Sequence, residues 1–530
     1  MFLLKRWFYK IEIPEGYKKY DKEKMKREIE NKIKRRKVII FFDEINTCKS
    51  LGLVKQIMCD KNYRKANNIP DRFIVICACN PYRILKKENQ KLLFGLNLRN
   101  KKKRKLVYTV NPMPDSLLNF ILDFKDLTKE TTKKYIDKII KTMIGNNEYY
   151  ELIEKLIETS HFFIKEKSDI SSVSLREINR FGKIYNFFNN YLEKRNIDKD
   201  IKQRQKNSII LSLYFCYYLR LPTTDLREEY LSKIKAIDTN LKFEEISRRE
   251  SEFILDKILE GKKGYAKNRA LRENLFCEFI CLENKEPLII CGKPGSSKSL
   301  SVRLLLDAMR GKFSSNDFFK DYNEVIPSFY QCSITSTSES VEEVFKRSRK
   351  KLENLKYEIN SLVFMDEMGI ADESKNNPLK VLHSELDENL KYEDNNKISF
   401  IGISNWSLDA SKMNRAINIV VEEPDIKYII ETAKEIARKI NEVFYVQYNT
   451  IINAISLAYY YYITIYQPNQ GKEDFHGFRD FYYLIKYIFY SINKNYSKIN
   501  KDINNNNFDE LLSYVLKGII RNFGGIPNSI

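Results

Sequence analysis

A loop rich in glycine and serine carries the strongest chemical signal in the sequence. Residues 287–299 read Pro-Leu-Ile-Ile-Cys-Gly-Lys-Pro-Gly-Ser-Ser-Lys-Ser. We expect Leu288–Cys291 to form a strand, because it is short and apolar, and a helix to follow the loop and end at Gly311. A loop of this kind between a strand and a helix is the setting in which main-chain amides hold phosphate groups.

Each residue type in this loop suits that chemistry. Gly292 and Gly295 let the backbone turn its N–H groups around phosphate oxygens, and the helix start adds the positive end of its dipole. Lys298 can reach the β and γ phosphates, and Ser299 can bind Mg²⁺. Ser297 stands where the usual pattern has a second glycine, and a Gly/Ser-rich turn with a chance Lys-Ser pair is the alternative. The residues predicted to hold nucleotide here are Gly292, Lys293, Pro294, Gly295, Ser296, Ser297, Lys298, Ser299 and Leu300.

Two acidic residues follow an apolar segment further along the chain. Leu362–Met365 runs directly into Asp366 and Glu367. Carboxylates at the end of a buried strand cost desolvation energy unless they handle a cation or a proton. We therefore predict that Asp366 and Ser299 hold Mg²⁺ and that Glu367 is the general base for an attacking water. The alternative is a pair of acids that caps the next helix.

Three more polar residues could complete this site. Asn405 ends the next apolar segment and could hydrogen-bond the attacking water or the γ-phosphate, although asparagine also forms turns. Arg415, ten residues later, could project into a neighbouring site as an arginine finger. Arg479 opens a predicted helix and could touch the γ-phosphate. For both arginines a surface salt bridge is the alternative.

The same signals recur in the same order in the first half of the chain. Val38–Phe42 runs into Asp43 and Glu44, another apolar segment ends at Asn80, and Arg176 opens a later helical pattern. The spacing from glutamate to asparagine is 36 residues in this half and 38 in the other. A repeat of this length indicates tandem domains. These four polar residues form a predicted second, partial site.

The order of apolar and helical patterns predicts the fold class. Strand–helix alternation favours a mostly parallel α/β sheet, and fully apolar strands fit a sheet with helices on both faces. After each asparagine the pattern changes to longer helices, which we interpret as helical lids. We assign residues 1–262 to a truncated module and 263–530 to a complete one. No Gly-x-x-x-x-Gly-Lys motif precedes Asp43, so the first module is degenerate or the chain is a fragment, which we favour.

Composition narrows the class of protein. Hydrophobic residues make up 43% of the chain, enough for a large core, and no run of 18 apolar residues predicts a membrane span. Nine cysteines without paired spacing and three histidines predict no zinc finger, and the thiols are expected to be reduced and intracellular. The net charge of +21, densest at Lys101–Lys105, is spread along the chain, which disfavours nucleic acid as a partner. Met1–Lys10 lacks a cleavage site, so no signal peptide is predicted.

Several strings together resemble one protein family. The sequences CGKPGSSKSLS (291–301), MDEMGIADESKNNPLKVLH (365–383), FIGISNWSLDASKMNRA (400–416) and FFDEINTCKSLGL (41–53) are similar to the mysterin family, and the likeness extends from about Val38 to Gly525. The resemblance implies a P-loop AAA+ core with helical lids, in tandem modules of a dynein-like ring on one chain. It also implies ubiquitin-ligase activity, a cytoplasmic location and, in some members, association with lipid droplets. The zinc elements of the family's ligase modules are not found in this sequence.

We therefore predict an AAA+ ATPase that binds ATP and Mg²⁺, with neighbouring AAA+ modules and, by resemblance, the ubiquitin system as partners. One alternative is a nucleotide-binding scaffold with little turnover. Another is a remodelling ATPase stimulated by nucleic acid, which the positive charge suggests. Replacement of Glu367 by Gln separates the enzyme from the scaffold, because only the enzyme has turnover to lose.

Overall fold

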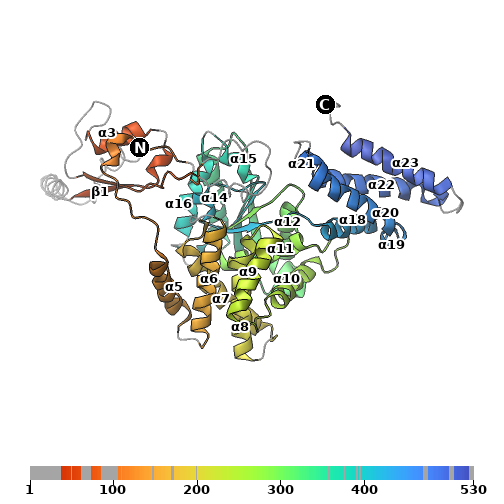
Figure 1. Ribbon diagram of the computed structural model, residues 1–530, viewed down its shortest axis with the longest axis horizontal. Coiled ribbons are helices and arrows are strands. Elements are labelled where there is room, and N and C mark those ends of the chain that lie inside the picture. The colour runs from red at the N-terminus through yellow and green to blue at the C-terminus, as the bar shows by residue number, and fades with distance from the viewer. Residues whose placement is uncertain are drawn as a thin grey trace. The chain divides into compact units, whose positions relative to one another are not determined.

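The chain forms two compact units in a computed structural model (Figure 1). The structure describes residues 37–48, 50–60, 73–84, 106–108, 110–145, 148–168, 172–197, 200–355, 359–374, 376–389, 392, 396–469, 475–499 and 506–524. Unit 1 comprises residues 1–84 and 106–126, and unit 2 comprises residues 85–105 and 127–530. The basic run Lys101–Lys105 and the segment Met1–Lys10 lie outside the described residues.

Unit 1 contains a small parallel sheet. Its strands are β1 (Val38–Phe42) and β2 (Phe73–Cys77), paired in register from Val38 opposite Phe73 to Phe42 opposite Cys77. Its helices are η1 (Ile45–Thr47), α3 (Leu51–Met58) and α4 (Asp115–Leu118). Within the described residues, Ile39 and Phe41 are exposed although β1 is apolar on both faces.

Unit 2 is built on a five-stranded parallel sheet. The strands are β3 (Leu288–Cys291), β4 (Glu324–Gln331), β5 (Ile359–Asp366), β6 (Ser399–Ser404) and β7 (Ile417–Val420). Their order across the sheet is β4-β5-β6-β3-β7, and every pairing is parallel. Strand β3, which leads into the glycine-rich loop, therefore lies between β6 and β7. Because parallel strands end at the same edge, the loop and the acids at the end of β5 share that edge.

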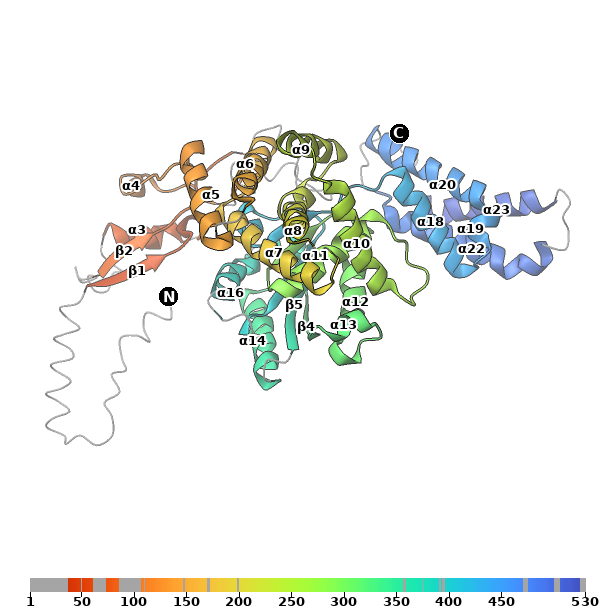
Figure 2. The same cartoon turned by 90° about the horizontal axis from the view of Figure 1, so that it is seen from below.

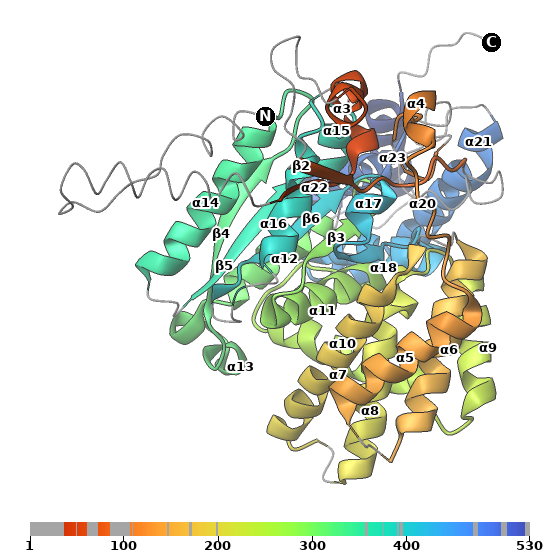
Figure 3. The ribbon, with the colours of Figure 1, turned by 90° about the vertical axis from the view of Figure 1, so that its left-hand side faces the viewer.

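Each face of this sheet packs into its own hydrophobic core, because side chains alternate along a strand. On β3, Leu288 and Ile290 join one core while Ile289 and Cys291 join the other. The first core also contains the helices α11 (Arg269–Asn284) and α12 (Lys298–Ala308). The second contains α14 (Ser338–Asn354) and α16 (Val381–Asn389). Figure 3 shows the strands between α14 and α11. The predicted α/β class, with a parallel sheet covered on both faces, is confirmed.

Shorter elements complete this part of the chain. They are η4 (Tyr218–Arg220), η5 (Gly311–Phe313), α13 (Asp317–Lys320), α15 (Met368–Asp372), η6 (Pro378–Lys380) and α17 (Ala410–Met413). The turn Gly261–Gly264, where we placed the join between modules, lies between α10 (Phe243–Leu259) and α11. Both of its glycines have positive φ angles, 74° and 80°, which glycine adopts at little cost.

Two sets of helices flank the sheet. The first is α5 (Lys129–Ile144), α6 (Tyr150–Lys167), α7 (Leu175–Lys194), α8 (Ile201–Cys216), α9 (Thr224–Ile237) and α10 (Phe243–Leu259). The second is α18 (Ile426–Ile440), α19 (Phe444–Gln447), α20 (Asn449–Tyr461), the π-helix η8 (Tyr462–Tyr466), α21 (Gln467–Asn469), α22 (Phe478–Ile499) and α23 (Asn506–Phe523). Helices α7 and α22 begin alike, because Glu177 accepts from Ser174 N at 2.7 Å and Asp480 accepts from Gly477 N at 2.8 Å.

Buried ion pairs fasten α7 to the sheet-bearing part of unit 2. Arg180 donates to Glu177 at 3.0 Å and to the carbonyl of Ala416 at 3.2 Å, next to β7. Its Nε lies 3.5 Å from Glu286, which also accepts from Lys183 at 3.0 Å. Charges buried in this way need partners, since one lost partner leaves the other charge uncompensated. Figure 2 shows α7, α8 and α10 beside α11.

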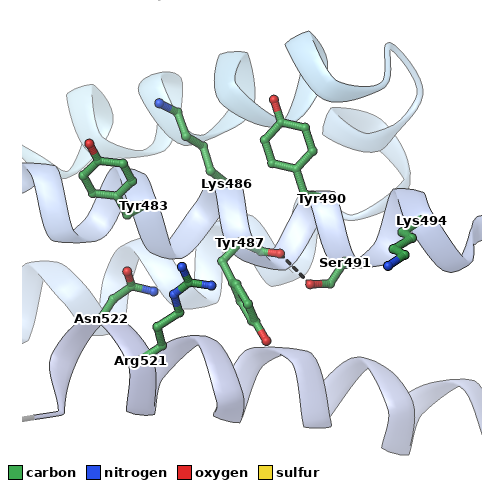
Figure 4. A pocket seen from close by; sticks show the side chains of 8 residues that line it. All are labelled: Tyr483, Lys486, Tyr487, Tyr490, Ser491, Lys494, Arg521 and Asn522. Carbon is green, nitrogen blue, oxygen red and sulfur yellow. Dashed lines mark hydrogen bonds between the residues drawn. The ribbon is translucent and has the colours of Figure 1, made fainter.

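The second helical set carries an open pocket on its surface (Figure 4). Tyr483, Lys486 and Tyr490 come from α22, and Arg521 and Asn522 come from α23. The Nζ of Lys486 lies 5.5 Å from the centre of the Tyr483 ring, which is a cation–π arrangement. No described helix in the chain is long and apolar enough to cross a membrane.

We expect loss of the Phe279 ring to destabilise unit 2 strongly. Phe279 on α11 is fully buried and contacts the rings of Phe318, Phe319 and Tyr322. Phe279→Ala should lower the free energy of unfolding by about 3–5 kcal/mol, because it removes a ring and leaves a cavity. Urea unfolding followed by circular dichroism measures this. Phe313→Ala is the control: its ring is 82% exposed, so the change should stay within about 0.5 kcal/mol.

Candidate nucleotide site

The sheet brings the loop and the acidic pair into direct contact. Gly292 N donates to the carbonyl of Ser404 at 3.2 Å, which joins the start of the loop to the end of β6. Strand β5 is the next neighbour of β6, and it ends at Asp366. Ser299, in the first turn of α12, donates its hydroxyl to Asp366 Oδ2 at 3.2 Å. Two hard oxygen ligands therefore lie side by side, the donor type that Mg²⁺ prefers.

Lys298 is buried and folds back over its own loop. Its Nζ donates to the carbonyls of Gly292 at 2.6 Å and Lys293 at 2.9 Å, and it lies 3.3 Å from Ser296 Oγ. These partners are neutral oxygens, which satisfy the three donors of an ammonium group without neutralising its charge. A phosphate could take their place and supply the missing negative charge.

Burial changes the acid–base behaviour of this lysine. It lowers the pKa of Lys298 to about 8, because desolvation disfavours the ammonium form. The charge of Arg479 lowers this pKa further, whereas the charges of Asp366 and Glu367 raise it. All three predicted site residues are therefore close enough to act on Lys298 electrostatically.

The backbone of the loop adopts conformations that L-residues rarely take. Gly295 has φ 89°, and a Cβ there would meet Phe478 Cβ at 2.8 Å, so only glycine fits. Ser297 has φ 60°, in the left-handed region that favours glycine. This explains why glycine is usual at this place and shows that serine adopts the same geometry.

Glu367 also lies in the left-handed region, with φ 54° and ψ 39°. Its N–H donates to Asp366 Oδ1 at 2.8 Å, so the two acids are held in a fixed relation. Glu44, its counterpart in unit 1, has nearly the same angles, φ 50° and ψ 47°. Strained backbone of this kind costs about 1–3 kcal/mol and is concentrated at functional sites. That both copies keep it is independent support for the repeat.

In unit 1 two residues of the predicted partial site are in contact. Asn80 Nδ2 donates to Glu44 Oε1 at 3.4 Å. Asn46 holds Asn80 by two bonds, donating to its carbonyl at 2.7 Å and accepting from its N–H at 3.3 Å. Asp43 precedes Glu44 at the end of β1. The amide and the carboxylate predicted to act together are thus in contact.

The predicted arginines fall into two places. Arg415 Nε donates to Asp387 at 3.2 Å, and its Nη1 donates to the carbonyl of Ser411 at 2.8 Å. Arg176 lies 3.8 Å from the same Asp387 carboxylate. None of these contacts involves the phosphate loop. Arg479 is instead the second residue of α22, and its backbone N lies 3.6 Å from the position that a Cβ on Gly295 would take.

Asn405 directly follows Ser404, whose carbonyl accepts a hydrogen bond from Gly292 N of the loop, so Asn405 lies where β6 meets the loop.

Four residues that contact the loop, its neighbours or one another were not predicted from the sequence. Tyr482 donates to the carbonyl of Gly295 at 3.1 Å, and the Tyr428 hydroxyl lies 3.4 Å from the Tyr482 hydroxyl. Glu423 forms an ion pair with Lys293 at 2.6 Å. The Glu278 carboxyl lies 2.6 Å from Ser301 Oγ. The placement of Tyr482 three residues after Arg479, on the same helical face, was the available signal.

Comparison with known proteins agrees with this geometry. A family model described as the RNF213 AAA domain matches residues 264–428. The human E3 ubiquitin-protein ligase RNF213 is 32% identical over 494 residues, which cover 85% of this chain. The chain belongs to the RNF213 (mysterin) family. The E3 ubiquitin-protein ligase rnf213-beta of Danio rerio is 32% identical and the mouse RNF213 31%, each over 85% of the chain.

The RNF213-family chain spans about 9% of the length of these relatives. The matched AAA domain begins at Gly264, the last residue of the turn that precedes α11, and includes the loop, the acidic pair, Asn405 and Arg415. The resemblance seen in the sequence is therefore confirmed, and with it membership of a nucleotide-binding class of domains.

We expect ATP binding to take up protons at alkaline pH. Without nucleotide Lys298 loses its proton around pH 8. Phosphate favours the charged form and raises this pKa, so ATP affinity should fall by up to about tenfold per pH unit above pH 8. Titration calorimetry at pH 8.5 in buffers of different ionisation enthalpy measures the uptake. Lys312→Ala, an exposed lysine on η5, should keep it; a wild-type protein without uptake would contradict the assignment.

A second prediction concerns Glu278, buried behind α12. Ser301 Oγ lies 2.6 Å from both Glu278 Oε1 and the carbonyl of Lys298. Ser301 donates to the Glu278 carboxyl, which lowers the pKa of that group, but desolvation has the larger and opposite effect. Burial raises the pKa of Glu278 well above its usual value.

A raised pKa in the folded state means that Glu278 costs stability as pH rises above the unfolded value of 4.5. Glu278→Gln keeps a donor and cannot ionise. Its stability relative to the wild type should therefore increase between pH 5 and pH 8, by up to about 1.4 kcal/mol per pH unit. Urea unfolding at four pH values measures the difference. A difference that stays constant with pH would show that Glu278 is ionised in the folded protein.

Proposed function

We propose that this chain binds Mg²⁺-ATP at the loop 292–300 and hydrolyses it to ADP and phosphate. The observation that carries the proposal is the contact between Ser299 and Asp366, with the Lys298 ammonium in the same loop. This arrangement combines a cation and a pair of oxygens suited to a metal ion at one edge of a parallel sheet.

The residues have distinct roles in the proposed reaction. The amides of residues 292–300 and Lys298 hold the phosphates, and Ser299 and Asp366 would hold Mg²⁺, which offsets charge on the β and γ phosphates when bound. Glu367 orients a water and accepts its proton as the water oxygen bonds to the γ-phosphorus. The bond from that phosphorus to the β–γ bridging oxygen breaks, and ADP leaves with the electron pair. Asn405 positions the same water, and Arg479 contacts the γ-phosphoryl group from the lid.

The proposed modules, residues 1–262 and 263–530, carry different parts of the proposed machinery. Asp43, Glu44 and Asn80 form the partial site of the first, while Arg415 serves as an arginine finger toward a neighbouring module. In that role Arg415 exchanges its present partner, the carboxylate of Asp387, for the phosphate of the neighbouring site.

A wider role follows from the relatives, which are named E3 ubiquitin-protein ligases. We propose that this chain supplies ATPase modules to such a protein and acts with neighbouring AAA+ modules and the ubiquitin system. A cytoplasmic location, with association with lipid droplets, follows from the same resemblance.

Lys298→Ala should weaken ATP binding about tenfold or more, because it removes a charge-assisted contact to phosphate. Titration calorimetry measures the affinity, with Lys312→Ala as the control. Glu367→Gln should abolish phosphate release while it leaves ATP binding unchanged. Phosphate release near background in the wild type and in Glu367→Gln alike would favour a nucleotide-holding scaffold. Unchanged ATP affinity in Lys298→Ala would remove the loop from the site.

A further inference from the structure

The turn that carries Asn405 is closed by its two neighbours in the sequence. Ser404 Oγ accepts a hydrogen bond from Trp406 N at 3.3 Å and donates one to the Trp406 carbonyl. That carbonyl also accepts from Cys291 Sγ at 3.7 Å, at the end of β3. Local bonds of this kind fix the course of the backbone through a turn. The indole of Trp406 therefore projects from a fixed point next to the residue proposed to position the attacking water.

The indole of Trp406 packs against the backbone that follows Glu367. A Cβ on the buried Gly369 would lie 2.5 Å from Trp406 Cε2 and 2.8 Å from both Trp406 Nε1 and Ser404 Oγ. Only glycine lets a backbone and a rigid ring approach so closely. Among the described residues Trp406 Nε1 is buried without a hydrogen-bond partner, so packing holds the ring in place.

A second close approach joins the same two segments. A Cβ on Gly402 of β6 would lie 2.1 Å from Sδ of Met368, which is fully buried and directly follows Glu367. The start of α15 thus contacts β6 and the turn after it at two successive residues. A left-handed backbone such as that of Glu367 persists only where the surrounding structure holds it. These two contacts lie at the residues that follow it.

Unit 1 joins the corresponding segments by different chemistry. Asn46 follows Glu44 by two residues, as Gly369 follows Glu367. The Asn46 side chain donates to the Asn80 carbonyl at 2.7 Å and accepts from the Asn80 N–H at 3.3 Å. In both units the second residue after the glutamate is therefore joined to the segment of the asparagine. Hydrogen bonds make the link in one unit, and an indole packed on glycine makes it in the other.

We propose that Trp406 is a positioning residue, which sets the placement of Glu367 relative to Asn405 by packing its indole on Gly369. This inference rests on the proposed hydrolysis, in which Glu367 and Asn405 hold the same water. A displacement of about 1 Å between groups that act on one reacting atom can lower a rate by about a hundredfold. Phosphate binding by the loop does not require this placement, so Trp406 affects turnover rather than ATP affinity.

The first test removes the ring. Trp406→Ala should lower kcat by about ten- to a hundredfold and change the dissociation constant for ATP by less than about threefold. Titration calorimetry gives the affinity and the number of sites that bind ATP. Phosphate release per binding site then gives kcat, so a misfolded fraction does not count as a lost rate. Phe313→Ala, at an exposed aromatic residue, is the matched control and should change neither quantity.

The second test exchanges the chemistry of unit 2 for that of unit 1. Gly369→Asn alone should lower kcat about as much as Trp406→Ala, because its Cβ meets the indole. In Gly369→Asn/Trp406→Ala the ring is gone and the new amide can bond the backbone of Asn405, as in unit 1. This double variant should recover about tenfold in kcat over Gly369→Asn, since residues in contact do not act additively. Gly52→Asn on α3, where a Cβ has no atom within 4 Å, is the control for the glycine change.

The outcomes separate this inference from the proposed function. If Glu367→Gln is inactive while Trp406→Ala keeps the kcat of Phe313→Ala, Trp406 has no positioning role and the site stands. A loss of ATP affinity as large as the loss of kcat would show that the indole supports the loop instead. Additive losses in the double variant would show that positions 369 and 406 are not linked. If the wild type releases no more phosphate than Glu367→Gln, the proposed hydrolysis fails and this inference fails with it.

Discussion

The site depends on one buried positive charge. The ammonium group of Lys298 is removed from water and has three neutral oxygen atoms of its own loop as partners. Neutral acceptors satisfy its protons but not its charge, so the desolvation cost is only partly offset. Around this charge lie the loop itself, Asp366 at the end of β5, and the start of α22, where Tyr482 donates to the Gly295 carbonyl.

The sheet order explains how residues far apart in sequence reach that charge. Because β3 lies between β6 and β7, the loop has Ser404 and Asn405 on one side and the segment that leads to the lid on the other. That segment is tied down by ion pairs: Glu423 binds Lys293 of the loop, and Glu422 binds Arg269 of α11 at 2.8 Å. The segment that leads from the sheet to the lid is therefore held by ion pairs both to the loop and to α11.

Much of this arrangement could be predicted from the sequence. The strand–loop–helix order, the acids at the end of an apolar strand and the internal repeat all follow from local patterns, and the parallel α/β fold follows from them. The packing of the first helical set could not be predicted, because the contact of Arg180 and Lys183 with Glu286 joins residues about a hundred positions apart and leaves no periodic signal. The same holds for the lid tyrosines, since Tyr428 and Tyr482 resemble the many other tyrosines of this chain until the fold brings them to the loop. The contact of Arg415 with Asp387 likewise depends on tertiary structure.

The left-handed turn at residue 297 has a consequence for how such proteins are found. A sequence pattern that requires glycine before the lysine in effect requires a left-handed backbone angle, which glycine adopts at the lowest energetic cost. Here serine holds that angle, with φ 60°. Searches that require the letter rather than the dihedral angle would discard this chain, and with it any homologue in which another L-residue adopts the same angle.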